Sequence, residues 1–263
     1  MDRTYRSWIF SLIVCFACLS ISAAPAHSTT IVAIRTPDLV VIAGDSAATF
    51  RGGGLPETTK LTCKVFSVGA AAFATSGLVK DAGRGFNAEA IVDRALKQRK
   101  SMRETMMEIR SELSAALITE FERLKKEEPL IYGRCLKKED CSTFLSEALI
   151  ATFEGHEPVV SVIVFQGQAD LSGRIGLNVI TTDCPGVGCP SGVKIFYLGQ
   201  GSAIQRYIDE HGISMLPEKA APFLVGLEIE AGTPSVGPPI DVLKITKDGV
   251  SWISRKSDCT GSP

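Results

Sequence analysis

The feature that most constrains the fold is a pair of apolar, β-branched runs that do not alternate with polar residues. The runs are Thr30–Ile34 and Leu39–Ala43, and the polar residues Arg35-Thr36-Pro37-Asp38 join them, which predicts a β-hairpin. A strand that is apolar at nearly every position needs cover on both faces of its sheet. The chain must therefore supply a packing layer on each side of this hairpin.

Later segments supply candidates for those layers. Ala88–Glu128 contains neither glycine nor proline, and its apolar residues recur at helical spacing, while Ser202–His211 and Pro217–Glu230 are also expected to be helical. Further strands are expected at Lys64–Ser67, Ala70–Thr75, Glu147–Phe153, Val159–Phe165, Gly173–Thr181, Val193–Leu198, Ile240–Thr246 and Val250–Ser254. This order predicts an α+β fold of two antiparallel sheets packed together and covered outside by helices. An ordinary two-layer α+β domain fits the same order.

Composition excludes two broad classes of protein. Of 263 residues, 45% are hydrophobic, which is too apolar for a disordered chain. The 28 basic and 29 acidic residues leave a net charge of −1, which argues against a nucleic-acid partner.

The first 28 residues have the pattern of a secretory signal peptide. Arg3 and Arg6 precede an apolar run from Trp8 to Ile21, and small residues follow around Pro25. Cleavage is expected after Ser28, with cleavage after Ala26 as the alternative. An uncleaved membrane anchor is a further alternative, because the length of the run overlaps that of short anchors. The prediction is a secreted or periplasmic protein with one domain at residues 29–263 and no membrane association after cleavage.

Cysteine content fits export. Six of the eight cysteines lie beyond residue 28, and an even number in an oxidising compartment favours disulfides. Two pairs flank turn-like segments and one pair remains, so the expected bonds are Cys135–Cys141, Cys184–Cys189 and Cys63–Cys259. A zinc site is the rival interpretation, but neither His156 nor His211 lies at ligand spacing from a cysteine. No metal and no cofactor is expected.

Cleavage after Ser28 would make Thr29 the N-terminal residue. A terminal threonine carries a hydroxyl next to a free α-amine, whose pKa of roughly 7.7–8.0 lets it accept a proton near neutral pH. The amine could therefore act as the base that activates the hydroxyl for nucleophilic attack. By itself this signal is weak, because every exported protein begins with some residue.

The sequence around Thr29 strengthens the signal. Thr29-Thr30 opens the first strand, and Asp45 follows sixteen positions later in the segment Ala43-Gly44-Asp45-Ser46-Ala47. Further on, Ser76-Gly77-Leu78-Val79-Lys80-Asp81-Ala82 leads from a strand towards the first helix. These segments closely resemble mature proteasome β-subunits and the bacterial ring-forming peptidases related to them. The resemblance implies the four-layer αββα sandwich of the N-terminal nucleophile hydrolases and covers residues 29–82; beyond them it concerns the fold alone.

The resemblance also implies residue roles. Thr29 would be the nucleophile, Asp45 would hold a lysine beside it, and the Gly77 N–H would stabilise the oxyanion. Lys60 is one residue short of the family's lysine spacing and Lys64 is three beyond it, so Lys60 is the preferred lysine. The family positions that contact substrate correspond to Ala48, Thr49, Thr75 and Val79. Thr49 and Val79 would hold the substrate as an added strand, and the small size of Ala48, Thr75 and Val79 suggests substrates with uncharged side chains.

Two departures from the family pattern affect the support of the terminal amine. Gln200, in Gly199-Gln200-Gly201, replaces a serine, although Ser202 follows closely. Ser235 matches a second serine, but Gly232 stands where the family has an aspartate. Either Glu228 or Glu230 compensates for these changes, or the activity is reduced or redirected.

The expected function is that of an exported threonine peptidase acting on peptides or unfolded proteins. No ATPase partner is expected, because ATP is scarce outside the cytoplasm, and the protein could form homo-oligomers. The alternatives are a catalytically silent assembly or binding protein and a hydrolase of non-peptidic amides.

Overall fold

The structure is a computed structural model that describes residues 29–52, 55–81, 85–98, 100–127, 129, 132, 145–169, 174–187, 189, 192–233 and 235–259. The expected signal peptide and the Cys135–Cys141 pair lie outside these residues. Among the described residues, no helix is both long enough and apolar enough to cross a bilayer.

Two five-stranded antiparallel sheets form the centre of the molecule. Sheet 1 has the order β12-β1-β2-β13-β14, with β1 at Thr30–Arg35, β2 at Leu39–Gly44, β12 at Lys194–Gly199, β13 at Asp241–Thr246 and β14 at Gly249–Ser254. Sheet 2 has the order β11-β10-β9-β6-β5, with β5 at Val65–Val68, β6 at Ala71–Gly77, β9 at Ser146–Glu154, β10 at Glu157–Ala169 and β11 at Ile175–Cys184. These bounds agree with the expected strands to within a few residues.

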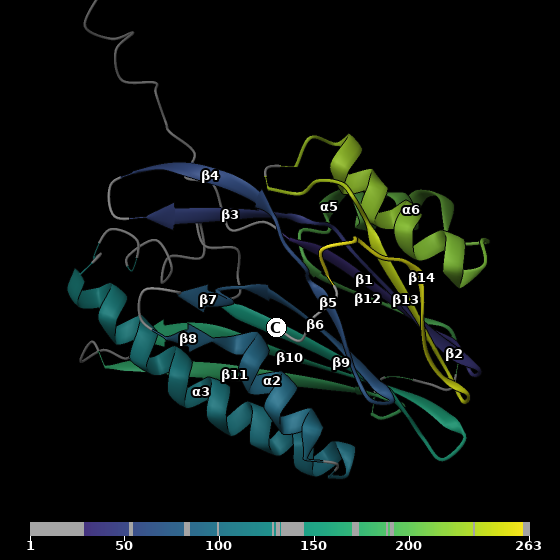
Figure 1. Cartoon of the computed structure of the whole chain (residues 1–263), viewed down its shortest axis with the longest axis horizontal. Helices are drawn as coiled ribbons and strands as arrows, with labels where there is room; N and C mark the ends of the chain where they lie inside the picture. Colours follow the sequence, from purple (N-terminus) through teal and green to yellow (C-terminus); the bar gives the residue numbers. More distant parts are fainter. Residues whose placement is uncertain are drawn as a thin grey trace, which may run out of the picture.

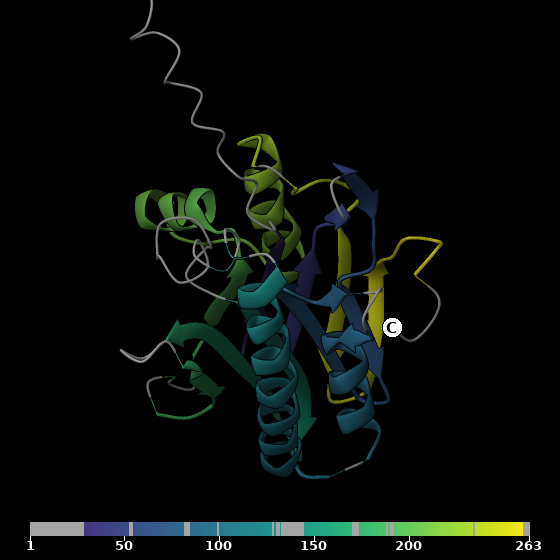
Figure 2. The same cartoon turned by 90° about the vertical axis from the view of Figure 1, so that its left-hand side faces the viewer.

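The helices lie on the outer faces of the two sheets. Helices α2 (Ala88–Lys97) and α3 (Met102–Glu127) cover sheet 2, whereas α5 (Ser202–His211) and α6 (Pro217–Glu230) cover sheet 1 (Figures 1 and 2). The single helical region expected at 88–128 is thus two helices. Asn87 caps the first of them by accepting a hydrogen bond from the N–H of Ala90 at 3.0 Å.

Three apolar cores explain why the first hairpin lacks alternation. Val32 on β1 faces α6, whereas Ile31 and Ala33 face sheet 2 across the central core. Ile150 on β9 faces the other way and packs against α3 through residues such as Leu113. Each central strand therefore buries both of its faces. The α+β class with antiparallel sheets is confirmed, and the layers follow the order helices, sheet, sheet, helices.

Two small strand pairs were not expected. Strands β3 (Ala47–Gly52) and β4 (Leu55–Leu61) form a hairpin in a segment where no strand was expected, and Figure 1 shows it extending from one end of the sheets. Strands β7 (Lys80–Asp81) and β8 (Phe86–Asn87) form the second pair. Both pairs lie next to segments that carry predicted site residues.

Two disulfides confirm two of the three expected bonds. Cys184–Cys189 closes a short loop after β11, and Cys63–Cys259 joins residues that are 196 positions apart. Structural disulfides are typical of proteins that fold in an oxidising compartment.

Removing the long-range bond should lower stability measurably. We expect the double substitution of Cys63 and Cys259 by serine to lower the free energy of unfolding by about 2–4 kcal/mol, because the unfolded chain regains the entropy that the bond removes. Substituting Cys184 and Cys189 should cost less, since their bond closes a much shorter loop. Urea unfolding of both variants measures the difference. Equal losses in the two variants would contradict this explanation.

Candidate active site

Thr29 is held through its backbone at the start of β1. Its carbonyl oxygen accepts a hydrogen bond from the N–H of Gln200 at 2.8 Å, and the Thr30 hydroxyl donates to the Gln200 carbonyl oxygen at 3.0 Å. Both contacts use only the backbone of Gln200, so they do not depend on its side chain. The end of β12 therefore fixes the chain on both sides of the Thr29–Thr30 peptide bond.

Gly199 allows this close approach. It pairs with Thr30 in the sheet and has φ +73°, a conformation that side chains disfavour. A Cβ atom at this position would lie 1.9 Å from the carbonyl oxygen of Thr29. Only glycine fits here without displacing Thr29.

Asp45 is the buried acceptor at the centre of the site. Its Oδ1 accepts from the N–H of Thr30 at 2.9 Å and from Nζ of Lys64 at 2.7 Å. Its Oδ2 accepts from the N–H groups of Ala47 at 3.1 Å and Gly237 at 3.0 Å. The side chain is fully buried. Asp45 thus connects the first strand, the lysine and the C-terminal loop, and its contact with that strand is to Thr30, the residue after Thr29.

The preference for Lys60 as the partner of Asp45 is wrong. Lys64 makes that ion pair, and only 5% of its side chain is exposed. Lys60 lies on β4 opposite Ala48 and is exposed. The reason is the unexpected β3–β4 hairpin, which places Lys60 within β4 and leaves Lys64, which follows that strand, to pair with Asp45. Burial lowers the pKa of Lys64 below its ordinary value, Asp45 opposes this effect, and the nearby Lys256 adds to it.

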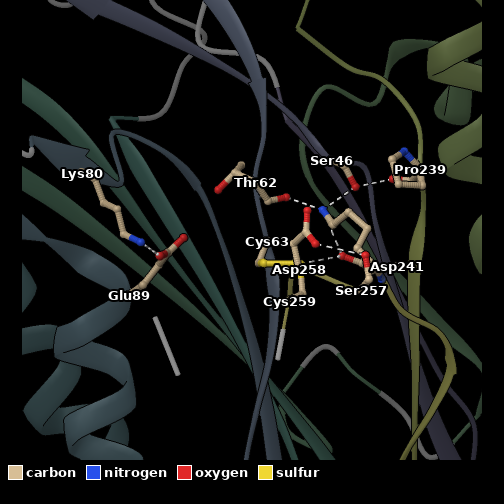
Figure 3. Close-up of a disulfide and its surroundings, with 11 residues drawn as sticks. Ser46, Thr62, Cys63, Lys80, Glu89, Pro239, Asp241, Ser257, Asp258 and Cys259 are labelled. Atoms are coloured by element: carbon tan, nitrogen blue, oxygen red, sulfur yellow. Dashed lines mark hydrogen bonds and ion pairs between the residues drawn. A yellow bond between two sulfur atoms is a disulfide. The ribbon is translucent and has the colours of Figure 1, made fainter. Parts of the chain in front are cut away.

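A second lysine, the half-buried Lys256, lies near the first ion pair. Nζ of Lys256 lies 3.2 Å from Oδ2 of Asp241 and donates to the Ser46 hydroxyl and to the Thr62 carbonyl oxygen. Figure 3 shows Ser46, Thr62 and Asp241 close to the disulfide that joins Cys63 to Cys259. The C-terminal segment is therefore fixed beside Ser46 and Cys63, the chain neighbours of Asp45 and Lys64; the sequence predicted the disulfide but not the Lys256 contacts.

Gly77 ends β6 in a backbone conformation that favours glycine. It has φ +82°, and a Cβ atom there would lie 2.7 Å from the carbonyl oxygen of Leu145. A side chain at this position would therefore meet backbone. Its role as oxyanion donor stays a prediction.

Glu147 is a site residue that the sequence analysis missed. It lies on β9 opposite Ser76, is 5% exposed, and accepts hydrogen bonds from the Ser76 hydroxyl at 2.5 Å and from the Gly199 N–H at 2.6 Å. Burial raises the pKa of its carboxyl group, and these two bonds partly offset that rise. The sequence does show one charged residue at the start of the apolar run 147–151, but that run predicted only a strand.

The four predicted substrate-contacting residues lie in two segments. Ala48 and Thr49 are on β3, and Ala48 is half-buried. Thr75 is buried on β6, and the half-buried Val79 follows that strand, with its carbonyl oxygen accepting from the N–H of Ala88 at 2.8 Å. That these residues line one substrate pocket stays a prediction.

The predicted supporting residues lie at the start of α5 and in the loop that precedes Gly237. Ser202 is the first residue of α5 and is exposed, and Ser235, with φ 62°, lies in the loop that brings Gly237 to Asp45. Of the two candidate compensating acids, Glu230 is exposed and Glu228 is buried.

Glu228 accepts from the N–H groups of Ala203 at 2.7 Å and Ile204 at 3.2 Å, and from the Thr233 hydroxyl at 2.8 Å. These bonds cap α5 immediately after Gln200. Glu228 therefore supports the segment that holds Thr29, rather than Thr29 itself.

A groove of about 660 Å³ lies elsewhere, against α3. Its lining includes Met102, Arg103, Met106, Glu157 and Asp183 and none of the predicted site residues. We therefore define the candidate site by the contacts of Thr29, Asp45 and Lys64. Within the described ranges, no three His, Cys, Asp or Glu side chains gather in a way that could hold a metal ion.

The raised pKa of Glu147 predicts a pH dependence of stability. A carboxyl group with a higher pKa in the folded protein contributes stability below its ordinary pKa, and that contribution is lost as the pH rises through the raised value. Glu147→Gln does not titrate, so its free energy of unfolding should fall less than that of the wild type between about pH 4 and pH 8. Urea unfolding across this range tests the sign, and identical slopes would contradict it.

Comparison with models of known protein families gives no match, and comparison with curated proteins gives none.

Proposed function

We propose that this protein is an exported N-terminal-threonine hydrolase that cleaves amide bonds, with Thr29 as nucleophile. The observation that carries the proposal is the set of backbone bonds that hold Thr29 and Thr30 next to the buried Asp45–Lys64 pair. The four-layer arrangement supports a fold of the N-terminal nucleophile hydrolase type. The two disulfides support export, and cleavage after Ser28 would free the amine of Thr29.

In the proposed reaction, the Thr29 hydroxyl oxygen attacks the carbonyl carbon of a peptide bond and gives its proton to the α-amine. The Gly77 N–H donates to the oxyanion that forms on the substrate. The α-amine then passes the proton to the leaving amine as the C–N bond breaks, and an ester to Thr29 remains. Water hydrolyses this ester, releases the acid and restores the hydroxyl. No ATPase partner is needed for short peptides or unfolded chains.

The lysine and aspartate prepare the terminus for this chemistry. The Lys64 ammonium favours the neutral form of a nearby amine, because like charges repel, and the neutral amine is the form that accepts a proton. Asp45 orients both the lysine and the first peptide N–H through the same oxygen atom, Oδ1. The positive charge therefore has a fixed position relative to Thr29.

Labelling of the mature protein tests the proposal. The protein is purified from the exported fraction, its terminus is sequenced, and it is treated with a β-lactone that acylates terminal threonines. We expect a terminus at Thr29 and one added reagent mass on the peptide that begins there. A terminus at residue 27 or earlier, or a free Thr29 that gains no mass, would count against hydrolase activity.

A binding or assembly protein without catalysis is the second candidate. It is favoured by the position of Glu228, which caps α5 and bonds to Thr233 and therefore does not replace the missing aspartate at Gly232. A free Thr29 that stays unlabelled would support this candidate. If Thr29 does acylate, comparing turnover of peptides and small amides separates a peptidase from a hydrolase of other amides.

A further inference from the structure

Glu147 is the buried carboxylate that connects the two sheets at the candidate site. It belongs to β9 of sheet 2, and its Oε2 accepts one bond from Ser76 of the same sheet and another from Gly199 of sheet 1. Leu149 and Ala151 follow Glu147 at alternate positions and face the core between the sheets. A strand points alternate side chains to one face, so the carboxylate lies at the end of the central apolar layer.

Each partner of Glu147 precedes a residue of the proposed machinery. Ser76 is followed by Gly77, the proposed oxyanion donor. Gly199 is followed by Gln200, whose N–H holds the carbonyl oxygen of Thr29 at 2.8 Å. One oxygen atom therefore connects the strand that carries the donor to the strand that holds the nucleophile.

The cost of this arrangement suggests a role beyond packing. A buried carboxyl group is unfavourable unless its hydrogen bonds are satisfied, so its presence at the end of an apolar run needs an explanation. An apolar residue there would leave the Gly199 N–H without an acceptor and would not fix Ser76.

We propose that Glu147 is a positioning residue that sets the separation between the Thr29 hydroxyl and the Gly77 N–H. The inference rests on the proposed hydrolase function and adds to it a residue that does not touch the substrate. Catalytic geometry is sensitive to displacement, and a shift of about 1 Å can cost about 100-fold in rate. The proposal therefore predicts a large effect on the rate of acylation and a small effect on reagent binding.

The test uses three variants of the mature protein. Glu147→Ala removes both bonds, Glu147→Gln keeps an oxygen that can accept them, and Ser76→Ala removes only one. Glu120→Ala is the matched control, because Glu120 is a buried carboxylate on α3 that pairs with Arg123 at 2.9 Å. For each protein, acylation of Thr29 is followed by mass spectrometry at several β-lactone concentrations. This gives the maximal rate and the half-saturating β-lactone concentration separately.

We expect Glu147→Ala to lower the maximal rate of acylation about 100-fold, and Ser76→Ala to lower it about tenfold, with the half-saturating concentration changed less than about threefold. Glu147→Gln should recover most of the rate, and Glu120→Ala should keep the wild-type rate. If Glu147→Ala does not fold, the Ser76→Ala result decides, since that change removes a single hydroxyl.

Two results would overturn the inference alone. One is a folded Glu147→Ala variant, or Ser76→Ala in its place, that acylates at the wild-type rate. The other is Glu147→Gln being as slow as Glu147→Ala, which would assign the carboxyl group to proton transfer instead. A wild-type protein that does not acylate at a free Thr29 would overturn the proposed function and this inference together.

Discussion

Replacing Thr29 by alanine should abolish amide hydrolysis while the protein stays folded. The substitution removes the attacking oxygen but leaves the backbone bonds from Gln200 and Asp45 intact, because these bonds do not involve the Thr29 side chain. Loss of a nucleophile typically costs at least about 10³-fold in rate. The measurement is turnover of a fluorogenic peptide amide by chains that begin at residue 29.

Two comparisons make this result specific. Thr29→Ser keeps a hydroxyl on the terminal residue and should retain measurable turnover, whereas Thr119→Ala changes an exposed residue of α3 and should match the wild type. Each terminus must be verified by intact mass, since a change at residue 29 could alter processing. Full activity in a Thr29→Ala protein with a verified terminus would refute the proposed nucleophile.

Replacing Lys64 by methionine should destabilise the protein far more than replacing Lys60. Lys64→Met leaves the buried Asp45 carboxylate without its cationic partner, and breaking a buried pair on one side costs about 3–5 kcal/mol. Lys60→Met changes an exposed residue and should alter the free energy of unfolding by less than about 0.5 kcal/mol. Denaturant unfolding of both variants gives the comparison, and it does not require any enzymatic activity.

The same two variants also test whether the Asp45–Lys64 pair supports the candidate site. If the Asp45–Lys64 pair orients the first strand, Lys64→Met should slow acylation of Thr29 even at temperatures where the variant remains folded, whereas Lys60→Met should not. Equal stability losses in the two variants would show that Asp45 does not depend on Lys64.

The sequence was most informative where burial is uniform. The runs beginning at Thr30 and Leu39 predicted strands covered on both faces, and the three cores explain that pattern directly. It was least informative where a contact depends on a long-range register. The expected Lys60 failed because the β3–β4 hairpin was not predicted; its ladder places Lys60 opposite Ala48 and continues to the bond from the Thr62 N–H to the Ser46 carbonyl oxygen at 2.8 Å.

Contacts between residues far apart in the chain could also not be predicted from sequence patterns. Glu147 and Gly199 are 52 positions apart, and Lys256 and Ser46 are 210 apart, so no local spacing relates them. Asp45 and Gly77 were singled out because neighbouring residues carry the resemblance that implies their roles. Local motifs therefore indicated a candidate site, and the fold shows which charges lie beside Asp45.

The Cys63–Cys259 bond makes completion of the site depend on a segment far along the chain. Cys63 immediately precedes Lys64, and Cys259 follows Cys63 by 196 positions. This bond cannot form until the chain has been synthesised through residue 259 and has reached an oxidant. A product that ends before residue 256 would lack Lys256 and Cys259 together, so the lysine at the site would lose its covalent anchor and its neighbour at once.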